Sequence, residues 1–410
     1  MFYGHDAIIE ERGPYTYAVI ERKQDMKYLD DGNKLFYRTN KTWAFDQQRS
    51  CPTCYCSDKV ALPNLVYTAL LYMKRTMPMP KLYKFILDVF MIVMKIQPVS
   101  IAQLVSWNNW TELPWWNTKQ AREIVEVGDG INQTPGIGKN DKYEMFQSLA
   151  CRKFSLKYSG HEGHLNGIPS LGFSLEKDTY DGVSNIGYRY ENLEKANYFP
   201  DWPCGPNHTV EITERCLNIN CDKFENWCDK CCNANFINQT YVLPPGIIPL
   251  RCQPARTTIA PISAFLSAPH FLWSPNVVKT SLKGINPNPV LHDPGMFHLN
   301  SLSGHTVSGN FRVQFNVPLY PNTGSHLWSN VQTKIIPAVW IDLDVEVLDY
   351  ALNFFYLMVV VSQQIVFIIA ISCFVFSVSS SVHNIKKITK NFIRVCYLPS
   401  LYIRLYSKSM

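Results

Sequence analysis

The residues with the clearest capacity for chemistry are three closely spaced cysteines. Cys51, Cys54 and Cys56 have the short spacing of zinc ligands, and the same spacing also allows a disulfide. Disulfides persist in oxidising compartments, where a cysteine-rich chain with many glycosylation sequons belongs. We therefore expect a disulfide here rather than a zinc ion.

Two histidines form the second candidate for chemistry. His161 and His164 could offer imidazoles to a metal, but Gly163 favours a loop and no third ligand is adjacent. The chain has no Gly-x-Ser-x-Gly nucleophile turn and no Walker loop for phosphate. The sequence therefore predicts neither a metal site nor a cofactor, and it predicts that the protein is not an enzyme.

A cysteine-rich segment, residues 204–252, dominates the middle of the chain. Disulfides stabilise such an Asn- and Pro-rich segment by about 2–4 kcal/mol each, because they restrict the unfolded chain. Eleven of the 13 cysteines precede residue 351, so one is left unpaired or pairs between chains, which is compatible with a homo-oligomer. The cysteines of this segment are Cys204, Cys216, Cys221, Cys228, Cys231, Cys232 and Cys252.

Asparagine sequons mark the same part of the chain as glycosylated. All of them precede residue 351, which agrees with exposure of residues 1–350 to the secretory lumen. The acceptor residues are Asn40, Asn109, Asn132, Asn207 and Asn238.

Residues 351–378 predict a transmembrane helix. They contain no charged residue, and about 20 apolar residues suffice to cross a bilayer. The tail, 379–410, holds six basic residues and no acid, which places it in the cytosol by the positive-inside rule. Without those six, the 39 basic residues become 33 and equal the 33 acidic residues, so charge gives no reason to expect nucleic acid. A buried helix of a soluble protein is the alternative.

Strand patterns occur near both ends of residues 1–350. Residues 12–20 predict a turn leading into a strand, 30–33 a hairpin turn and 35–38 the return strand. Strict alternation over 311–317 predicts a half-buried strand. Residues 335–341 predict another strand, in which Pro337 indicates an edge or a bulge. Between 99 and 250 we expect loops and short strands.

Residues 62–97 read differently, as two apolar helices. The predicted helices cover 62–75 and 81–96, and the Pro-rich residues 77–80 separate them. We expect this pair to present apolar surface to a lipid or to pack on the protein. A second membrane span over 82–94 is the alternative.

Several segments, taken in order, resemble the class B scavenger receptors. They are residues 11–17, starting Glu-Arg-Gly-Pro-Tyr, 166–169, the Ser-Ala-Pro-His-Phe-Leu of 267–272, and 284–288 followed by His292. The resemblance covers most of residues 8–378. It implies a mainly β (α+β) fold: a large, antiparallel, β-barrel-like ectodomain with a helical apex and an internal lipid tunnel, plus the C-terminal transmembrane helix.

The resemblance also implies partners and site residues. It implies a receptor for fatty acids, phospholipids or lipoproteins at the plasma membrane, and a pairing of Cys151 with Cys252. A trafficking or adhesion receptor of the endolysosomal system, at the lysosomal membrane, is the alternative, although the tail lacks an acidic dileucine signal. The apex would fall at 62–97, and its basic residues would be Lys74, Arg75, Lys81 and Lys84.

Two departures from the family pattern stand out. Family members carry an N-terminal membrane span before the Gly-Pro-Tyr motif, which here starts at Gly13, and they carry more chain between Gln97 and Leu104. Gly128 also replaces a cysteine that is frequent in the family. A shortened form of the chain, or a paralogue that has lost its function, would account for these differences.

Overall fold

The fold was analysed in a computed structural model, which describes most of residues 8–396 and divides the chain into two units. The larger unit comprises residues 1–165 and 169–347, and the smaller one comprises 166–168 and 348–410. The described residues are 8–58, 91–95, 103–114, 116, 118–130, 132–148, 150–181, 185–188, 190, 196–200, 243–250, 264–321, 331–347 and 349–396.

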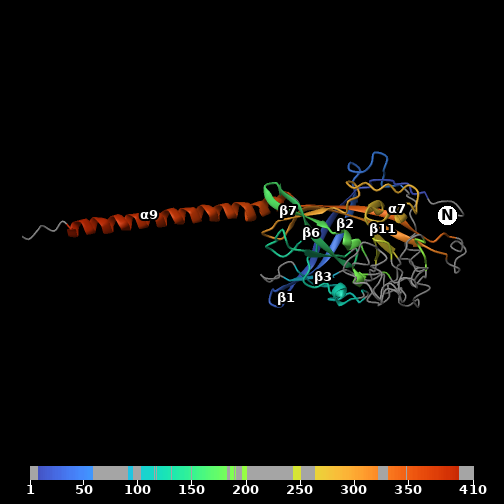
Figure 1. The fold of residues 1–410 in the computed structure, drawn as a ribbon, viewed down its shortest axis with the longest axis horizontal. Coiled ribbons are helices and arrows are strands. Elements are labelled where there is room, and N and C mark those ends of the chain that lie inside the picture. The colour runs from blue at the N-terminus through green and yellow to red at the C-terminus, as the bar shows by residue number, and fades with distance from the viewer. Residues whose placement is uncertain are drawn as a thin grey trace, which may run out of the picture. The chain divides into compact units, whose positions relative to one another are not determined.

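A four-stranded sheet in the larger unit has the order β1-β2-β3-β4 (Figure 1). The predicted hairpin is confirmed: antiparallel β1 and β2 are joined at 30–33, where Gly32 has a φ of +91°. The strands are β1 (Tyr17–Leu29), β2 (Lys34–Phe45), β3 (Met91–Lys95) and β4 (Leu104–Trp107).

Strand β3 corrects the prediction of a helix over 81–96. Its backbone pairs antiparallel with β2 on one side and with β4 on the other. The β-branched residues Ile92 and Val93 favour such a strand, and pairing on both sides overrides a weak helical pattern. The rest of the predicted helix pair, and with it the proposed apex, lies outside the described residues.

An eight-stranded sheet forms the rest of the larger unit, with the order β5-β6-β7-β10-β11-β9-β8 and β12 paired to β11. Its defined pairings are antiparallel, and neither sheet closes into a barrel within the described part of the chain. The strand-rich, antiparallel expectation is thus confirmed, while the barrel-like closure is not seen. The strands are β5 (Tyr143–Gln147), β6 (Arg152–Leu165), β7 (Ile168–Leu175), β8 (Ile247–Leu250), β9 (Ala264–Ser267), β10 (Met296–Leu299), β11 (Thr306–Leu319) and β12 (Lys334–Glu346).

Strands β11 and β12 confirm the two strands predicted near the C-terminal end of this unit. Phe315 pairs with Val339 and Asn316 with Pro337, so β12 bulges at Ala338, next to the proline. The prediction of a half-buried β11 is wrong in part. Gln314 and Asn316, on its polar face, are 2% and 0% exposed, because they bond each other and residues of β9.

Three apolar cores hold the larger unit together. One surrounds Phe265, Val278 and Val317, a second surrounds Phe154 and Phe311, and the third lies under the four-stranded sheet. The side chains on one face of β11 therefore contribute to two of these cores. The short helices of this unit are α3 (Lys119–Arg122), η1 (Lys177–Tyr180), η2 (Ile186–Tyr188), η4 (Pro269–Phe271) and α7 (Asn276–Lys279).

The smaller unit is helical over almost all of its described length. Helix α8 (Asp349–Tyr356) continues through a π-helical stretch, η6 (Leu357–Val361), into α9 (Ser362–Cys396) (Figure 1). Residues 352–386 form one helix that is long and apolar enough to cross a membrane, and its large apolar side chains are exposed. This agrees with the predicted membrane helix, because so much exposed apolar surface is suited to lipid.

Candidate functional site

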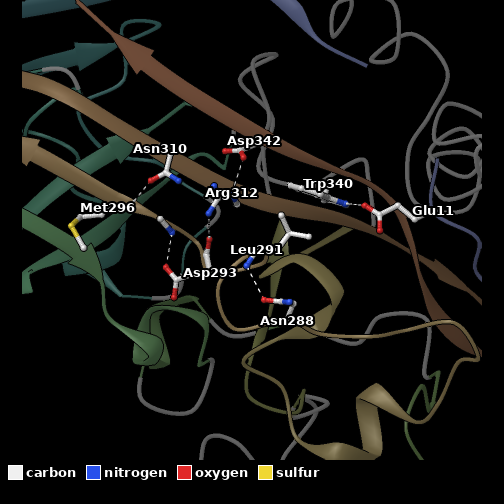
Figure 2. A network of polar contacts seen from close by, with 10 residues as sticks. Glu11, Asn288, Leu291, Asp293, Met296, Asn310, Arg312, Trp340 and Asp342 are labelled. Atoms are coloured by element: carbon white, nitrogen blue, oxygen red, sulfur yellow. Dashed lines mark hydrogen bonds and ion pairs between the residues drawn. The ribbon is translucent and has the colours of Figure 1, made fainter. Parts of the chain in front are cut away.

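A polar cluster lies where four distant segments of the larger unit meet. Glu11, His270, His292 and Trp340 form it, and we call it the histidine cluster. Three of the four belong to the segments that carry the family resemblance. Figure 2 shows Glu11 and Trp340 in contact, together with the polar network that surrounds the loop before β10.

His270 sits in a tight turn that directly follows β9. His270 and Phe271 both have left-handed backbone angles, with φ of 51° and 53°, which side chains other than glycine seldom adopt. The buried side chain of Gln314 accepts a hydrogen bond from the His270 backbone N–H at 2.8 Å. The polar face of β11 therefore fixes this turn and the direction of the imidazole.

His292 closes a second turn, on the loop before β10. The Asn288 side chain accepts hydrogen bonds from the backbone N–H groups of Val290 and Leu291, at 2.8 and 3.0 Å. The His292 backbone N–H donates to the Asn288 carbonyl at 2.9 Å. This local bonding brings the His292 ring back over His270, where the two rings stack with centroids 4.0 Å apart and an 11° interplanar angle.

Hydrogen bonds define the protonation of both rings. The backbone N–H of Asn286 donates to His270 Nδ1 at 3.2 Å, and that of Asn288 donates to His292 Nδ1 at 2.9 Å. An imidazole nitrogen that accepts a hydrogen bond carries no hydrogen, so both rings are neutral with their hydrogen on Nε2. His270 Nε2 then faces Glu11 Oε2 at 3.2 Å.

Glu11 connects the N-terminal segment to the cluster. Its Oε1 accepts a hydrogen bond from the Trp340 indole at 2.8 Å, while its Oε2 faces His270. Its side chain is 47% exposed, whereas that of His270 is 10% exposed. The carboxylate thus stands at the rim and the imidazoles lie inside, with the edge of Trp340 against His292 at a centroid distance of 5.9 Å.

Glu11, His270 and His292 have the composition of a metal site, because one ligand atom from each lies within 4.8 Å of the others. A histidine that binds a metal through Nε2 carries its hydrogen on Nδ1, where a second group accepts it. Here both Nδ1 atoms accept backbone N–H groups, so each ring carries its hydrogen on Nε2, where a metal would bind; this holds also for His292 Nε2, which has no hydrogen-bond partner among the described residues. The cluster as arranged does not fit a metal ion.

Burial, together with nearby charged groups, lowers the pKa of His292. Arg312 binds Asp342 through Nε at 2.8 Å and donates from Nη1 to the Asp293 carbonyl at 3.2 Å (Figure 2). Burial, the neighbouring His270 and Arg312 together lower the pKa of His292, and Glu11 opposes them. The neutral imidazole is therefore the favoured form.

The N-terminal segment docks on the loop that carries the cluster. The backbone N–H of Ile9 donates to the Lys283 carbonyl at 2.9 Å, and Ile8 and Lys283 form an isolated parallel bridge. Gly284 has a φ of +89°, and a Cβ there would meet the Ile9 carbonyl oxygen at 2.1 Å. Glycine is thus required both for the turn and for the close approach of the segment.

Two of the three cysteines of the first predicted site form a disulfide. Cys51 is bonded to Cys54, which confirms the disulfide interpretation over the zinc interpretation for this pair, and Cys56 is free and exposed. Cys151 is also disulfide-bonded. Its expected partner Cys252 lies outside the described residues, so the pairing stays a prediction.

The other predicted residues are only partly described. His161 and His164 lie on β6, not in a loop, because the strand continues through Gly163 to its end at Leu165. The side chains of Asn40 and Asn109 are exposed, whereas Asn132 is half-buried, with its amide 3.5 Å from Asp129. Outside the described residues lie Cys204, Cys216, Cys221, Cys228, Cys231, Cys232, Asn207, Asn238, Lys74, Arg75, Lys81 and Lys84.

The match to a known protein family covers the segments that form the histidine cluster. The family model described as CD36 family matches residues 2–99 and 97–385. The chain belongs to the CD36 family. The expected resemblance to class B scavenger receptors is thereby confirmed, and the two matched stretches meet at 97–99, where the sequence analysis expected family members to carry more chain.

Individual relatives extend this assignment of the CD36-family chain. An uncharacterized protein of Caenorhabditis elegans is 33% identical over 265 residues, which cover 64% of this chain and 46% of the relative. Lysosome membrane protein 2 of Rattus norvegicus is 20% identical over 83% of this chain and 70% of its own length. Scavenger receptor class B member 1 of Rattus norvegicus is 21% identical over 88% and 71%. The match thus spans about half the length of the first relative.

Proposed function

We propose that the protein is a membrane-anchored receptor that binds fatty acids, phospholipids or lipoproteins and delivers lipid to the membrane. It acts as a binding protein and not as an enzyme. The plasma membrane is the proposed location, with residues 1–350 outside the cytosol and 379–410 inside. The odd number of cysteines before residue 351 supports a homo-oligomer, in which one cysteine pairs between chains.

The single observation that carries this proposal is the match of the CD36 family model to almost the whole chain. The architecture supports it, because a strand-rich unit is followed by a helix suited to a membrane. A relative named scavenger receptor class B member 1 aligns with 88% of the chain. A receptor of this kind captures an amphiphile outside the membrane and passes its acyl chain to the bilayer.

Affinity in this mechanism has two sources. Each buried methylene of an acyl chain contributes about 0.8 kcal/mol, so apolar burial dominates the binding of long chains. Basic residues at the proposed apex attract anionic head groups or particles, and this attraction weakens as salt screens it. The proposed basic residues are Lys74, Arg75, Lys81 and Lys84.

Binding by the delipidated full chain in detergent tests the proposal. A photoactivatable fatty acid should label the wild-type chain, and unlabelled fatty acid should compete with it. Replacing the four apex basic residues by Gln should weaken the capture of anionic vesicles, and the double variant Lys386→Gln/Lys387→Gln in the tail is the matched control. If neither fatty acid, phospholipid nor lipoprotein binds the wild-type chain, the proposal fails.

A trafficking or adhesion receptor for a protein ligand in the endolysosomal system is the second candidate. The alignment of lysosome membrane protein 2 with 83% of the chain favours it. The tail weighs against it, because residues 379–410 contain no acidic residue and no Leu-Leu pair. Localisation of a tagged full-length chain separates the two candidates: surface staining supports the lipid receptor, and lysosomal staining at steady state supports the trafficking receptor.

A further inference from the structure

The histidine cluster is built around neutral imidazoles. Both Nδ1 atoms accept backbone N–H groups, at 3.2 Å for His270 and 2.9 Å for His292. The stacked rings have centroids only 4.0 Å apart. The His292 side chain is also 3% exposed, so water does not solvate an added charge there. Each of these features favours the uncharged ring.

A proton added to His292 would disrupt the loop before β10. The proton can bind only at Nδ1, because Nε2 already carries the hydrogen of the neutral ring. The new N–H of the ring would then point at the N–H of Asn288, and a donor facing a donor is repulsive. Since Asn288 lies on an exposed loop, the loop can move away from the ring.

The charged groups around His292 also favour its neutral form. His270 faces it from the turn after β9, and Arg312 faces it from β11; both oppose protonation. Glu11, on the N-terminal segment, favours protonation, and Asp342 on β12 already binds Arg312. Glu11 is half exposed, so water screens its attraction to a charged histidine.

The N-terminal segment depends on the same loop. Ile9 bonds Lys283, and Gly284 packs against the Ile9 carbonyl; these two loop residues lie three and two positions before Asn286. Glu11 reaches His270 and Trp340 from this segment. Movement of the loop from Lys283 to His292 therefore removes the contacts that the Ile9 backbone makes with Lys283 and Gly284.

We propose that the histidine cluster is an acid-sensitive clasp, which holds the N-terminal segment on the larger unit at neutral pH and releases it when His292 binds a proton. The clasp would distinguish the cell surface from an acidic compartment. The inference goes beyond the receptor function and requires no ligand, so its test is independent of lipid binding.

Hydrogen exchange of the full chain in detergent, followed by mass spectrometry, tests the clasp. We compare peptides covering 8–12 and 284–292 at about pH 7.4 and about pH 5.5, corrected for intrinsic exchange rates. His292→Asn keeps an acceptor for the Asn288 N–H but does not titrate. His298→Asn is the matched control, because burial also lowers the pKa of His298, which lies on β10 outside the cluster.

In the wild-type chain we expect exchange in both peptides to rise about tenfold at the lower pH. His292→Asn should remove most of this rise, and His298→Asn should leave it unchanged. A peptide from β2 reports whether each variant is folded, and His292→Gln replaces His292→Asn if that variant is not. Equal protection of the wild type at both pH values, or loss of the rise in His298→Asn, would overturn the proposal.

Discussion

Arg152 and His292 are basic side chains buried in the larger unit, and their surroundings differ. Arg152 Cζ lies 3.9 Å from the centroid of the Tyr188 ring and 5.2 Å from that of Phe154, and Nη2 donates to the Thr179 carbonyl at 3.0 Å. These contacts all suit a cation. His292 instead accepts a backbone N–H and stacks on a second imidazole, contacts that suit a neutral ring.

Arg152 carries a permanent charge, whereas the charge of His292 depends on the pH. Burial lowers the pKa of Arg152 to about 10, which still leaves the guanidinium charged at neutral and acidic pH. Burial lowers the pKa of His292 from its ordinary value of about 6.5, so the ring is neutral at neutral pH and gains its charge only in acid. Acid should therefore affect the histidine cluster and leave the Arg152 site intact.

The largest expected effect comes from removing the permanent charge. Arg152→Ala should lower the free energy of unfolding by about 2–4 kcal/mol, because it leaves a cavity and an unpaired Thr179 carbonyl. Arg152→Met keeps most of the volume and should cost less. Denaturant titration measures the free energy of unfolding of both variants. If Arg152→Ala is as stable as the wild type, the guanidinium does not stabilise the fold.

Adding a methyl group beneath the N-terminal segment should lower the free energy of unfolding by a smaller amount. Gly284→Ala should cost about 2–3 kcal/mol, because a strained φ adds to the clash with the Ile9 carbonyl. Gly32→Ala is the matched control: its φ is similar, at +91°, but nothing lies within 4 Å of the added Cβ. Thermal unfolding of the two variants compares them, and equal losses would mean that the segment does not dock there.

Acid should destabilise the wild-type chain by a smaller amount than Gly284→Ala. Because the folded-state pKa of His292 is lowered, its contribution is complete above about pH 6.5 and is lost as the pH falls through the folded-state pKa. Unfolding midpoints measured from about pH 7.5 downward should decline less steeply in His292→Asn. Arg152→Met should follow the wild-type slope, and a flattened slope in that variant would contradict the distinction between the two sites.

The smallest expected effect concerns the rim of the histidine cluster. Trp340→Phe removes the hydrogen bond to Glu11 and keeps an aromatic ring beside His292. The half-exposed position of Glu11 limits the loss to about 0.5–1 kcal/mol. Exchange at Ile9 should increase slightly at neutral pH, and unchanged exchange would show that Glu11 contributes nothing to the clasp.

Local patterns in the sequence predicted the elements that local physics determines. The membrane helix, the β1–β2 hairpin and strands β11 and β12 follow from apolar runs, turn residues and alternation. A disulfide in place of a zinc ion at Cys51, Cys54 and Cys56 follows from the oxidising compartment that the sequence indicates. Strand β3 could not be predicted in this way, because its short apolar run suits a helix equally well. Its partners, β2 and β4, decide the outcome.

The histidine cluster escaped prediction for a related reason. The sequence analysis used Glu11, His270 and His292 only as parts of family motifs and gave them no role. Their contact depends on two irregular turns, one with left-handed angles at His270 and one closed by Asn288, and neither turn has a period. Gln314 gives a signal for the position of the cluster. It lies on the polar face of β11 and is still buried, which shows that polar groups are held inside the protein at this place.

Residue-resolved hydrogen–deuterium exchange at the imidazole carbons tests the central claim most directly, because it reports the pKa of individual histidines in the folded chain. We expect the pKa of His292 in the folded chain to lie below its ordinary value of about 6.5, and unfolding to restore that value. A folded-state pKa of His292 at or above the unfolded value would show that the fold does not hold the ring neutral, and it would rule out the clasp.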